Sequence, residues 1–278
     1  MQGRLCPQVD GKIQAFPWQD WRTEFPAARA EGLGLMEWTL DHERLRENPV
    51  MHPAGRKEIL ALCREYGLAI PSLTGDLFMQ APFYKASGAL QDSLVEDMRA
   101  VVDACAEIGC GLVVMPLVDA GRLENQAQED CLVRELLRAV PQLEQRRVAV
   151  IFESDYTPQR YRAFLDRLPP EHFGVNLDTG NSAALGFAHG EELALYGDRV
   201  RNVHIKDRLA GGGTTVPLGT GAADIAGTLE GLAGLGYAGN FILQTARAAD
   251  GDHAAAIRRY REMTMRWVES AHPEGAAG

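Results

Sequence analysis

Short apolar runs alternate with longer amphipathic stretches from one end of the chain to the other. The apolar runs carry β-branched or aliphatic residues at successive positions, a pattern typical of parallel strands that helices cover on both faces. The pattern predicts strands at residues 35–38, 69–74, 112–117, 148–153, 174–178, 200–205 and 240–244. A further strand, the first, is expected at residues 1–5, where only a few residues are available.

Between these runs, apolar residues recur at helical spacing. The predicted helices cover residues 21–31, 53–66, 89–108, 126–145, 158–168, 190–196, 224–235 and 252–270. Several of them are followed by a glycine, which suits the left-handed position after a helix. These glycines are Gly32, Gly67, Gly109 and Gly236.

Repeated strand–helix units imply a parallel sheet, either a closed barrel or a doubly wound open sheet. The nucleotide-binding motifs of the open sheet, GxGxxG and GxxxxGK[ST], do not follow the early strands. Eight units in 278 residues favour the barrel, which commonly takes about 250 residues. We therefore expect an α/β fold, a single-domain (β/α)8 TIM barrel over residues 1–270, with a disordered tail at residues 271–278.

Composition and charge disfavour several classes of function. The chain is 46% hydrophobic and 24% charged, as in an ordinary globular protein, and its net charge is −10. Because phosphate contacts need basic side chains, this charge disfavours a nucleic-acid partner. Five cysteines without a CxxC pair indicate reduced thiols in a cytoplasmic protein. No run approaches about 18 apolar residues and residues 1–12 contain no apolar signal segment, so we expect neither a membrane partner nor secretion.

Polar side chains end four consecutive predicted strands: Glu153, Asp178, His204 and Gln244. In a barrel, catalytic groups project from the carboxyl ends of the strands, so these four would lie at one level. Taken singly, His204 is compatible with a core histidine and Asp178 with a turn cap. Together, two carboxylates, an imidazole and an amide oxygen suit one divalent metal ion, Mn²⁺, Mg²⁺ or Co²⁺, with Zn²⁺ as a further option.

The segments IFESD, VNLDTGN, NVHIKD and ILQTAR resemble the metal-binding strand ends of the xylose-isomerase-like barrels. Within that superfamily they are similar to the sugar phosphate isomerase/epimerase group, over residues 1–270. The resemblance implies one bound divalent ion, commonly Mn²⁺, with Glu153, Asp178 and His204 as ligands and Gln244 at the fourth ligand position. It also implies proton transfer next to a carbonyl of a small carbohydrate, and a homo-oligomer.

Two positions depart from the family pattern. The fourth ligand is usually glutamate, and in the epimerases of the family two glutamates act as a pair of acid and base. Gln244 cannot accept a proton, so Glu153 is left as a single base. One base suits an aldose–ketose isomerisation, and equally the β-elimination of water. The last residue of VNLDTGN is often histidine in relatives, whereas here it is Asn181, a candidate substrate contact.

Further candidates come from positions beside the predicted strand ends. By resemblance, Lys206 and Asp207 in the HIKD segment lie near the metal and the substrate and are candidate catalytic residues. Other polar residues are candidate substrate contacts, with an ordinary ion pair as the alternative for the arginines and the glutamate. These are Arg4, Glu37, Asp76 and Arg247.

The leading hypothesis is a metal-dependent isomerase or epimerase of a small sugar, sugar phosphate or cyclitol, with Glu153 as the base. A dehydratase that removes water from a keto-sugar at the same site is the alternative enzyme. A DNA-repair endonuclease of the same barrel type would need a three-metal cluster with histidines from earlier strands, and residues 69–74 and 112–117 supply none. A barrel that only binds a sugar is the non-enzymatic alternative.

Overall fold

The computed structural model describes residues 1–9 and 11–271. These residues form two compact units. The β1–β4 unit comprises Leu35–Asp155 and Ala163–Gly174. The β5–β9 unit comprises Met1–Gly34, Tyr156–Arg162 and the described chain from Val175 onward. Of the tail expected at residues 271–278, Ala271 belongs to the last helix and residues 272–278 lie outside the described part.

Four parallel strands form the sheet of the β1–β4 unit, and neighbours in the chain are neighbours in the sheet. They are β1 (Leu35–Thr39), β2 (Ala69–Thr74), β3 (Leu112–Leu117) and β4 (Ala149–Ser154). Most of their side chains are buried. The predicted strand ranges in this unit are therefore confirmed to within one residue at each end.

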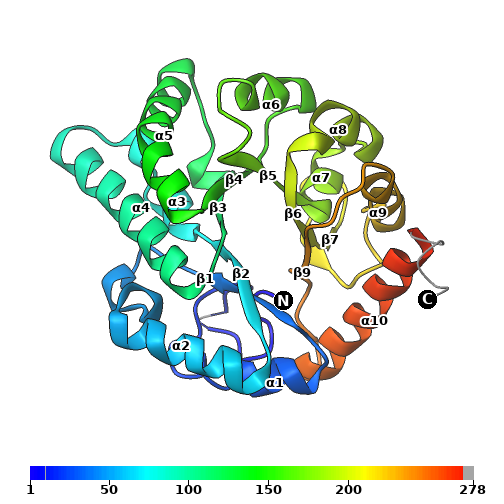
Figure 1. The fold of residues 1–278 in the computed structure, drawn as a ribbon. Coiled ribbons are helices and arrows are strands. Elements are labelled where there is room, and N and C mark those ends of the chain that lie inside the picture. The colour runs from blue at the N-terminus through cyan, green and yellow to red at the C-terminus, as the bar shows by residue number, and fades with distance from the viewer. Residues whose placement is uncertain (10, 272–278) are drawn as a thin grey trace. The chain divides into compact units, whose positions relative to one another are not determined.

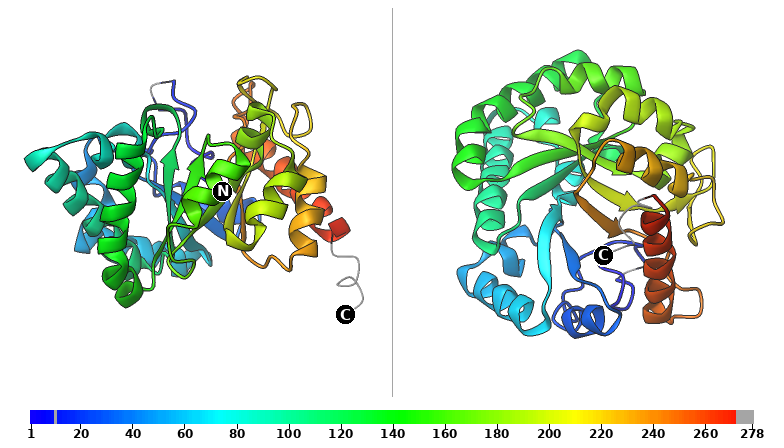
Figure 2. Two further views of the ribbon diagram at one scale, coloured as in Figure 1. Left: turned by 90° about the horizontal axis from the view of Figure 1, so that it is seen from above. Right: turned by 45° about the vertical axis from the view of Figure 1, so that its right-hand side comes forward.

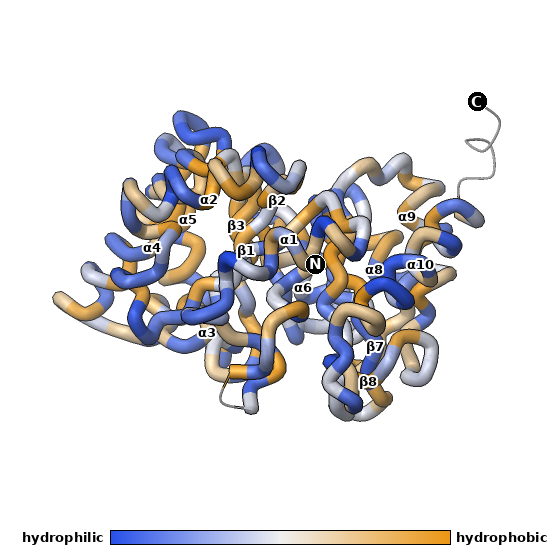
Figure 3. Tube along the Cα trace, turned by 90° about the horizontal axis from the view of Figure 1, so that it is seen from below, coloured by the Kyte–Doolittle hydropathy of each residue, from blue (hydrophilic) through white to orange (hydrophobic). Residues whose placement is uncertain are grey.

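Helices connect these strands and cover them on one side (Figure 1). The long helices are α2 (Pro53–Tyr66), α4 (Gly88–Ile108) and α5 (Gln126–Arg146). A short helix, α3 (Asp76–Gln80), follows β2, and α6 (Pro158–Leu165) runs from one unit into the other. Hydrophilic and hydrophobic positions alternate along α4, whereas β3 is mainly hydrophobic (Figure 3). The core of this unit therefore lies between its sheet and its helices.

The β5–β9 unit contains three further parallel strands in the order β5, β6, β9. Their bounds are β5 (Phe173–Asp178), which begins in the other unit, β6 (Val200–Ile205) and β9 (Asn240–Leu243). In the register of β5 and β6, Asp178 lies opposite His204. A small antiparallel pair, β7 (Asp207–Arg208) and β8 (Thr215–Val216), follows β6 in the chain. The polar ends of β5 and β6 are thus held at the same level.

The helices of this unit are α1 (Glu24–Ala30), α7 (Thr179–Leu185), α8 (His189–Tyr196), α9 (Ile225–Gly234) and α10 (His253–Ala271). Helices α9 and α10 lie side by side, orange and red in Figures 1 and 2. The predicted strands and helices of this unit are confirmed, with small shifts at their ends. Helix α7 was not predicted, and it starts directly at the end of β5.

The prediction of a strand at residues 1–5 is wrong, because these residues do not form an extended element. Gln2 makes a single backbone bond to the strand β9, from its N–H to the carbonyl of Leu243 at 3.1 Å. Gly3 has φ +44°, which turns the chain out of the extended conformation after one bond. The N-terminal segment therefore lies beside β9 without continuing a ladder.

The glycines that follow helices behave as predicted. Gly32, Gly67, Gly109 and Gly236 have φ values of +71°, +65°, +77° and +71°. Only glycine adopts this region without steric cost, which explains why these helices end there. Within residues 1–9 and 11–271, no helix combines the length and the apolar composition that crossing a membrane requires.

Candidate metal centre and active site

Asp178 is the last residue of β5 and is 3% exposed. Its Oδ1 accepts hydrogen bonds from the backbone N–H groups of Gly180 and Asn181, both at 2.9 Å, so it caps helix α7. The other oxygen, Oδ2, lies 3.9 Å from Nδ1 of His204 on the neighbouring strand. The helix cap therefore fixes the carboxylate and leaves Oδ2 directed toward His204.

His204 is fully buried on β6, and an amide orients its ring. Nδ1 of His204 lies 3.0 Å from Nδ2 of Asn176, and Oδ1 of Asn176 accepts a 2.8 Å bond from Nδ2 of Asn202. This chain of buried amides holds the imidazole in one orientation.

Lys206 joins two of the predicted ligand positions. Its Nζ donates to Oδ2 of Asp178 at 3.2 Å and to Oε1 of Gln244 at 2.9 Å. Nε2 of Gln244 in turn donates to Oε1 of Gln14 at 3.1 Å, which sets the amide so that Oε1 faces Lys206. The oxygens of Asp178 and Gln244 therefore converge on one cationic group.

Asp207 organises the loop between β6 and α9. It is fully buried, and its Oδ2 accepts hydrogen bonds from the backbone N–H groups of Gly219 and Gly221, both at 2.9 Å. Its Oδ1 accepts a 3.0 Å bond from the N–H of Ala223. A Cβ on Gly221 would lie 2.2 Å from Oδ1, so the loop approaches the carboxylate where only glycine fits. These contacts are structural, and the catalytic role of Asp207 stays a prediction.

Asn181 lies in the first turn of α7, and its Oδ1 accepts a 2.7 Å hydrogen bond from Nη1 of Arg208. Nε of the same guanidinium donates to the carbonyl of Gly213 at 2.9 Å. Arg208 thereby connects α7 with the loop that Asp207 organises. Sequence reasoning did not single out Arg208.

The two arginines predicted to contact substrate bind the backbone. Arg247 donates from Nη1 to the carbonyl of Cys6 at 2.7 Å, from Nη2 to that of Gly3 at 3.0 Å, and from Nε to that of Ile13 at 3.2 Å. Burial lowers the pKa of its guanidinium. Arg4 is 2% exposed and donates from Nε to the carbonyl of Thr245 at 2.9 Å. Both side chains anchor the N-terminal segment, and their contact with a substrate stays a prediction.

The remaining predicted site residues belong to the β1–β4 unit. Glu153 lies near the carboxyl end of β4, in register with Pro116 of β3, and is 8% exposed. Glu37 on β1 is buried and accepts hydrogen bonds from the hydroxyls of Ser72 and Thr74, both at 2.6 Å. Asp76 is the first residue of α3 and is 7% exposed. All three carboxylates are buried, which requires partners that balance their charge.

Sequence reasoning missed the amides that support the histidine. Asn176 and Asn202 each stand two residues before a strand-end ligand candidate, Asp178 and His204 respectively. Because side chains two apart on a strand share a face, this spacing could have identified them. Thr179 was also missed: its hydroxyl donates to the carbonyl of Lys206 at 2.6 Å and accepts from the N–H of the same residue at 3.0 Å.

Comparison with known proteins extends these observations to the whole chain. A curated protein of Escherichia coli (strain K12), named "Putative L-ribulose-5-phosphate 3-epimerase SgbU", is 24% identical over 268 residues, which cover 91% of this chain and 92% of that protein. The solved structure of an L-ribulose 3-epimerase superposes with a TM-score of 0.75 at 15% identity, covering 94% of this chain and 93% of its own. That of the IOLI protein with a bound zinc atom gives a TM-score of 0.74 at 16% identity, covering 90% and 93%.

The family description that matches this chain is that of the xylose isomerase-like TIM barrel, over residues 25–264. The match takes in both compact units and every strand from β1 to β9. Together with the structural neighbours, it confirms the α/β barrel expected from the strand–helix repeat. The chain therefore belongs to the xylose isomerase-like TIM barrel family.

Proposed function

We propose that this protein is a divalent-metal-dependent isomerase or epimerase of a small sugar, sugar phosphate or cyclitol. The observation that carries the proposal is the cluster at the ends of β5, β6 and β9. There, Asp178 and His204 lie opposite each other, and Lys206 bridges Asp178 and Gln244. Relatives with similar chains are named as epimerases of ribulose and of its 5-phosphate, which supports a small carbohydrate as the substrate.

We further propose that Glu153, Asp178 and His204 bind one divalent ion, with Gln244 at the fourth position. Two carboxylates, an imidazole and an amide oxygen suit Mn²⁺ first, and Mg²⁺, Co²⁺ or Zn²⁺ as alternatives. The bridging ammonium of Lys206 supports the fit, because the oxygens of Asp178 and Gln244 already share a cation. When bound, such an ion polarises a carbonyl and stabilises negative charge on its oxygen.

The proposed ligands differ in their capacity to take a proton from the substrate. Glu153 is a carboxylate and can take the proton from the carbon next to a substrate carbonyl. Gln244 cannot, since an amide is not a base, and its Oε1 already accepts a hydrogen bond from Lys206. Glu153 would therefore be the single base, and Lys206 the adjacent donor to substrate oxygens. This arrangement favours isomerisation over an epimerisation with two symmetric glutamates.

Proton exchange in D₂O tests the proposal. We expect the protein loaded with Mn²⁺ to incorporate deuterium next to the carbonyl of at least one ketose in a panel of ketopentoses, ketohexoses, their phosphates and inososes. Chelation of the metal or Glu153→Gln should lower the rate by at least about a hundredfold. Glu144→Gln, an exposed glutamate on α5, is the matched control and should leave the rate unchanged.

The same experiment separates the alternatives. An isomerised product keeps the mass of the sugar apart from deuterium, whereas a dehydratase product has lost one water. Loss of water would show that the protein is a dehydratase and not an isomerase. A single base also permits this reaction. Saturable sugar binding without exchange would contradict both enzymes and leave a sugar-binding barrel. The homo-oligomer, the cytoplasmic location and the lack of a nucleic-acid partner stay predictions.

A further inference from the structure

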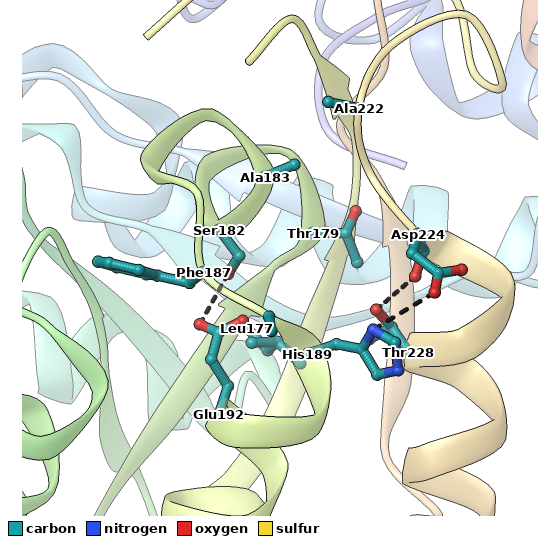
Figure 4. Close-up of a pocket in the computed structure, with 11 residues that line it drawn as sticks. Leu177, Thr179, Ser182, Ala183, Phe187, His189, Glu192, Ala222, Asp224 and Thr228 are labelled. Carbon is teal, nitrogen blue, oxygen red and sulfur yellow. Dashed lines mark hydrogen bonds and ion pairs between the residues drawn. The ribbon is translucent and has the colours of Figure 1, made fainter. Parts of the chain in front are cut away.

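A cavity of about 320 Å³ lies among α7, α8 and α9 of the β5–β9 unit (Figure 4). Its lining does not include Asp178, His204, Lys206 or Gln244. Leu177, Ala183, Phe187 and Ala188 provide apolar walls. The polar lining consists of three hydroxyls, two carboxylates and one imidazole: Thr179, Ser182, Thr228, Glu192, Asp224 and His189.

Glu192 is the most deeply buried charged side chain of this lining, at 3% exposure. Its Oε1 accepts hydrogen bonds from the hydroxyls of Ser182 at 2.8 Å and Tyr196 at 2.6 Å. Within the described part of the chain, no donor binds the second oxygen, Oε2. Burial raises the pKa of this carboxyl against the opposing effect of the two hydroxyl bonds. The carboxylate is thus held through Oε1, and Oε2 accepts no hydrogen bond from a described residue.

Asp224 and His189, the other ionisable groups of the lining, lie close to each other. Oδ2 of Asp224 lies 3.4 Å from Nδ1 of His189, and its Oδ1 accepts a 2.9 Å bond from the N–H of Gly227. None of the lining residues that the structure describes is a lysine or an arginine. Among the lining residues, His189 is the one group that can become cationic and lower the pKa of Glu192, and a positively charged ligand would add a permanent cationic partner.

We propose that this cavity binds a small primary ammonium compound, with the ammonium on Oε2 of Glu192 and a short hydrocarbon chain against Leu177 and Phe187. An ammonium group supplies the donors and the charge that Oε2 lacks. The apolar walls bury the chain, and the volume admits a few carbon atoms beside the ammonium. The proposal is independent of the metal-dependent activity, because it uses none of the proposed metal ligands.

Titration with n-butylammonium chloride, followed by NMR chemical shifts and calorimetry, tests this proposal. 1-Butanol is the neutral probe of nearly equal size, measured at the same ionic strength. We expect n-butylammonium to saturate the protein and to shift the signals of Ser182, Glu192 and Tyr196. It should bind at least tenfold more tightly than 1-butanol. Equal affinity for the two probes, or shifts confined to other parts of the chain, would overturn the proposal.

Two variants and one control complete the test. Glu192→Gln keeps an acceptor for Ser182 and Tyr196 and removes the charge, so it should lower n-butylammonium affinity at least tenfold. Glu191→Gln changes the exposed neighbour on α8 and should leave the affinity unchanged. Ala183→Leu fills the cavity while every polar group stays, and it should abolish binding even if Glu192→Gln fails to fold. Undiminished binding by either cavity variant would contradict the site.

Discussion

The ammonium of Lys206 lies between an oxygen of Asp178 and an oxygen of Gln244 in the candidate metal centre. Its ammonium contacts Asp178 at 3.2 Å and Gln244 at 2.9 Å, so a bound ion would share these oxygens with an existing positive charge. Like charges this close repel each other and weaken each other's binding. We therefore expect this lysine to lower the affinity of the proposed site for a metal ion.

Replacing Lys206 by methionine should raise the affinity of the metal-free protein for Mn²⁺ by about tenfold, because the competing charge is lost. Calorimetric titration with MnCl₂ measures the effect. Lys57→Met, at an exposed position of α2, is the matched control and should bind as the wild type does. Equal or weaker binding by Lys206→Met would mean that the ammonium and the ion do not share the site.

Asn176 supports the imidazole of His204 from a buried position. Asn176→Ala should lower Mn²⁺ affinity by about 10- to 100-fold, as loss of a group that orients a ligand commonly does. It should also reduce the free energy of unfolding by about 1–3 kcal/mol, since Asn202 loses its acceptor. Metal titration and urea denaturation give the two quantities.

Asn125→Ala provides the comparison for this variant. Asn125 caps α5 by accepting from the N–H of Gln128 at 3.0 Å, so its loss should cost about 1 kcal/mol of stability. Its Mn²⁺ affinity should stay that of the wild type. If both variants lost metal affinity alike, the effect of Asn176 would be general destabilisation.

The candidate site residues were predicted from their position along the chain, but their hydrogen-bond partners were not. Asp178, His204 and Gln244 were predicted because each ends an apolar run at the carboxyl side of a strand. The hydrogen bond of Lys206 to Gln244, and those of Arg247 to the N-terminal segment, join residues 38 to 244 positions apart. No local pattern carries such pairings, so a free side chain and a structural anchor look the same in the sequence.

At the scale of elements, long strands and helices were predictable and two short segments were not. Helix α7 has seven residues, including a glycine and an asparagine that disfavour helix. It forms because Asp178 caps it from the end of β5, a contact between two elements. The segment at residues 1–5 failed in the opposite way: a strand was expected there as the missing first strand of the barrel, but Gly3 turns the backbone after one bond.

The loop from β6 to α9 depends on Asp207. Asp207→Asn replaces an acceptor oxygen by an N–H₂ group that must face a backbone N–H. We expect hydrogen exchange at the amides of Gly219, Gly221 and Ala223 to speed up at least tenfold, measured by NMR or mass spectrometry. Asp252→Asn, which removes the charge but keeps an oxygen acceptor for Ala255 in the first turn of α10, should leave these amides unchanged.

The result also decides how Asp207 acts in any reaction. Faster loop exchange together with lost activity would assign Asp207 to holding the loop. Lost activity with unchanged exchange would contradict the loop account and favour a direct role in proton transfer. Gly221→Ala, whose Cβ would meet Oδ1 at 2.2 Å, should reproduce the loop effect while keeping the carboxylate.

At the scale of the whole molecule, His253 makes stability depend on pH. Burial, and then the charge of Arg247, lower the pKa of His253 from 6.5, against the opposite effect of Asp250 and Asp252. Its Nδ1 also accepts a 3.3 Å hydrogen bond from the N–H of Ala248, which only the unprotonated nitrogen can do. The folded state thus prefers the neutral ring.

The sign of the effect follows from the lowered pKa. Below pH 6.5 the unfolded chain binds a proton that the folded chain resists, so this stability is present above 6.5 and lost as the pH falls below it. Urea denaturation from about pH 8 to about pH 5 should show a steeper loss of unfolding free energy in the wild type than in His253→Gln. Parallel curves for the two proteins would contradict the account.

Glu153, Asp178 and His204 are the residues proposed to bind one divalent ion. Anomalous X-ray diffraction from crystals grown with MnCl₂ tests this proposal most directly. We expect one manganese peak at about 2.0–2.4 Å from both carboxylates and the imidazole, with the amide oxygen of Gln244 facing the same ion. A fully occupied peak on other residues, or none at these three under saturating Mn²⁺, would contradict it.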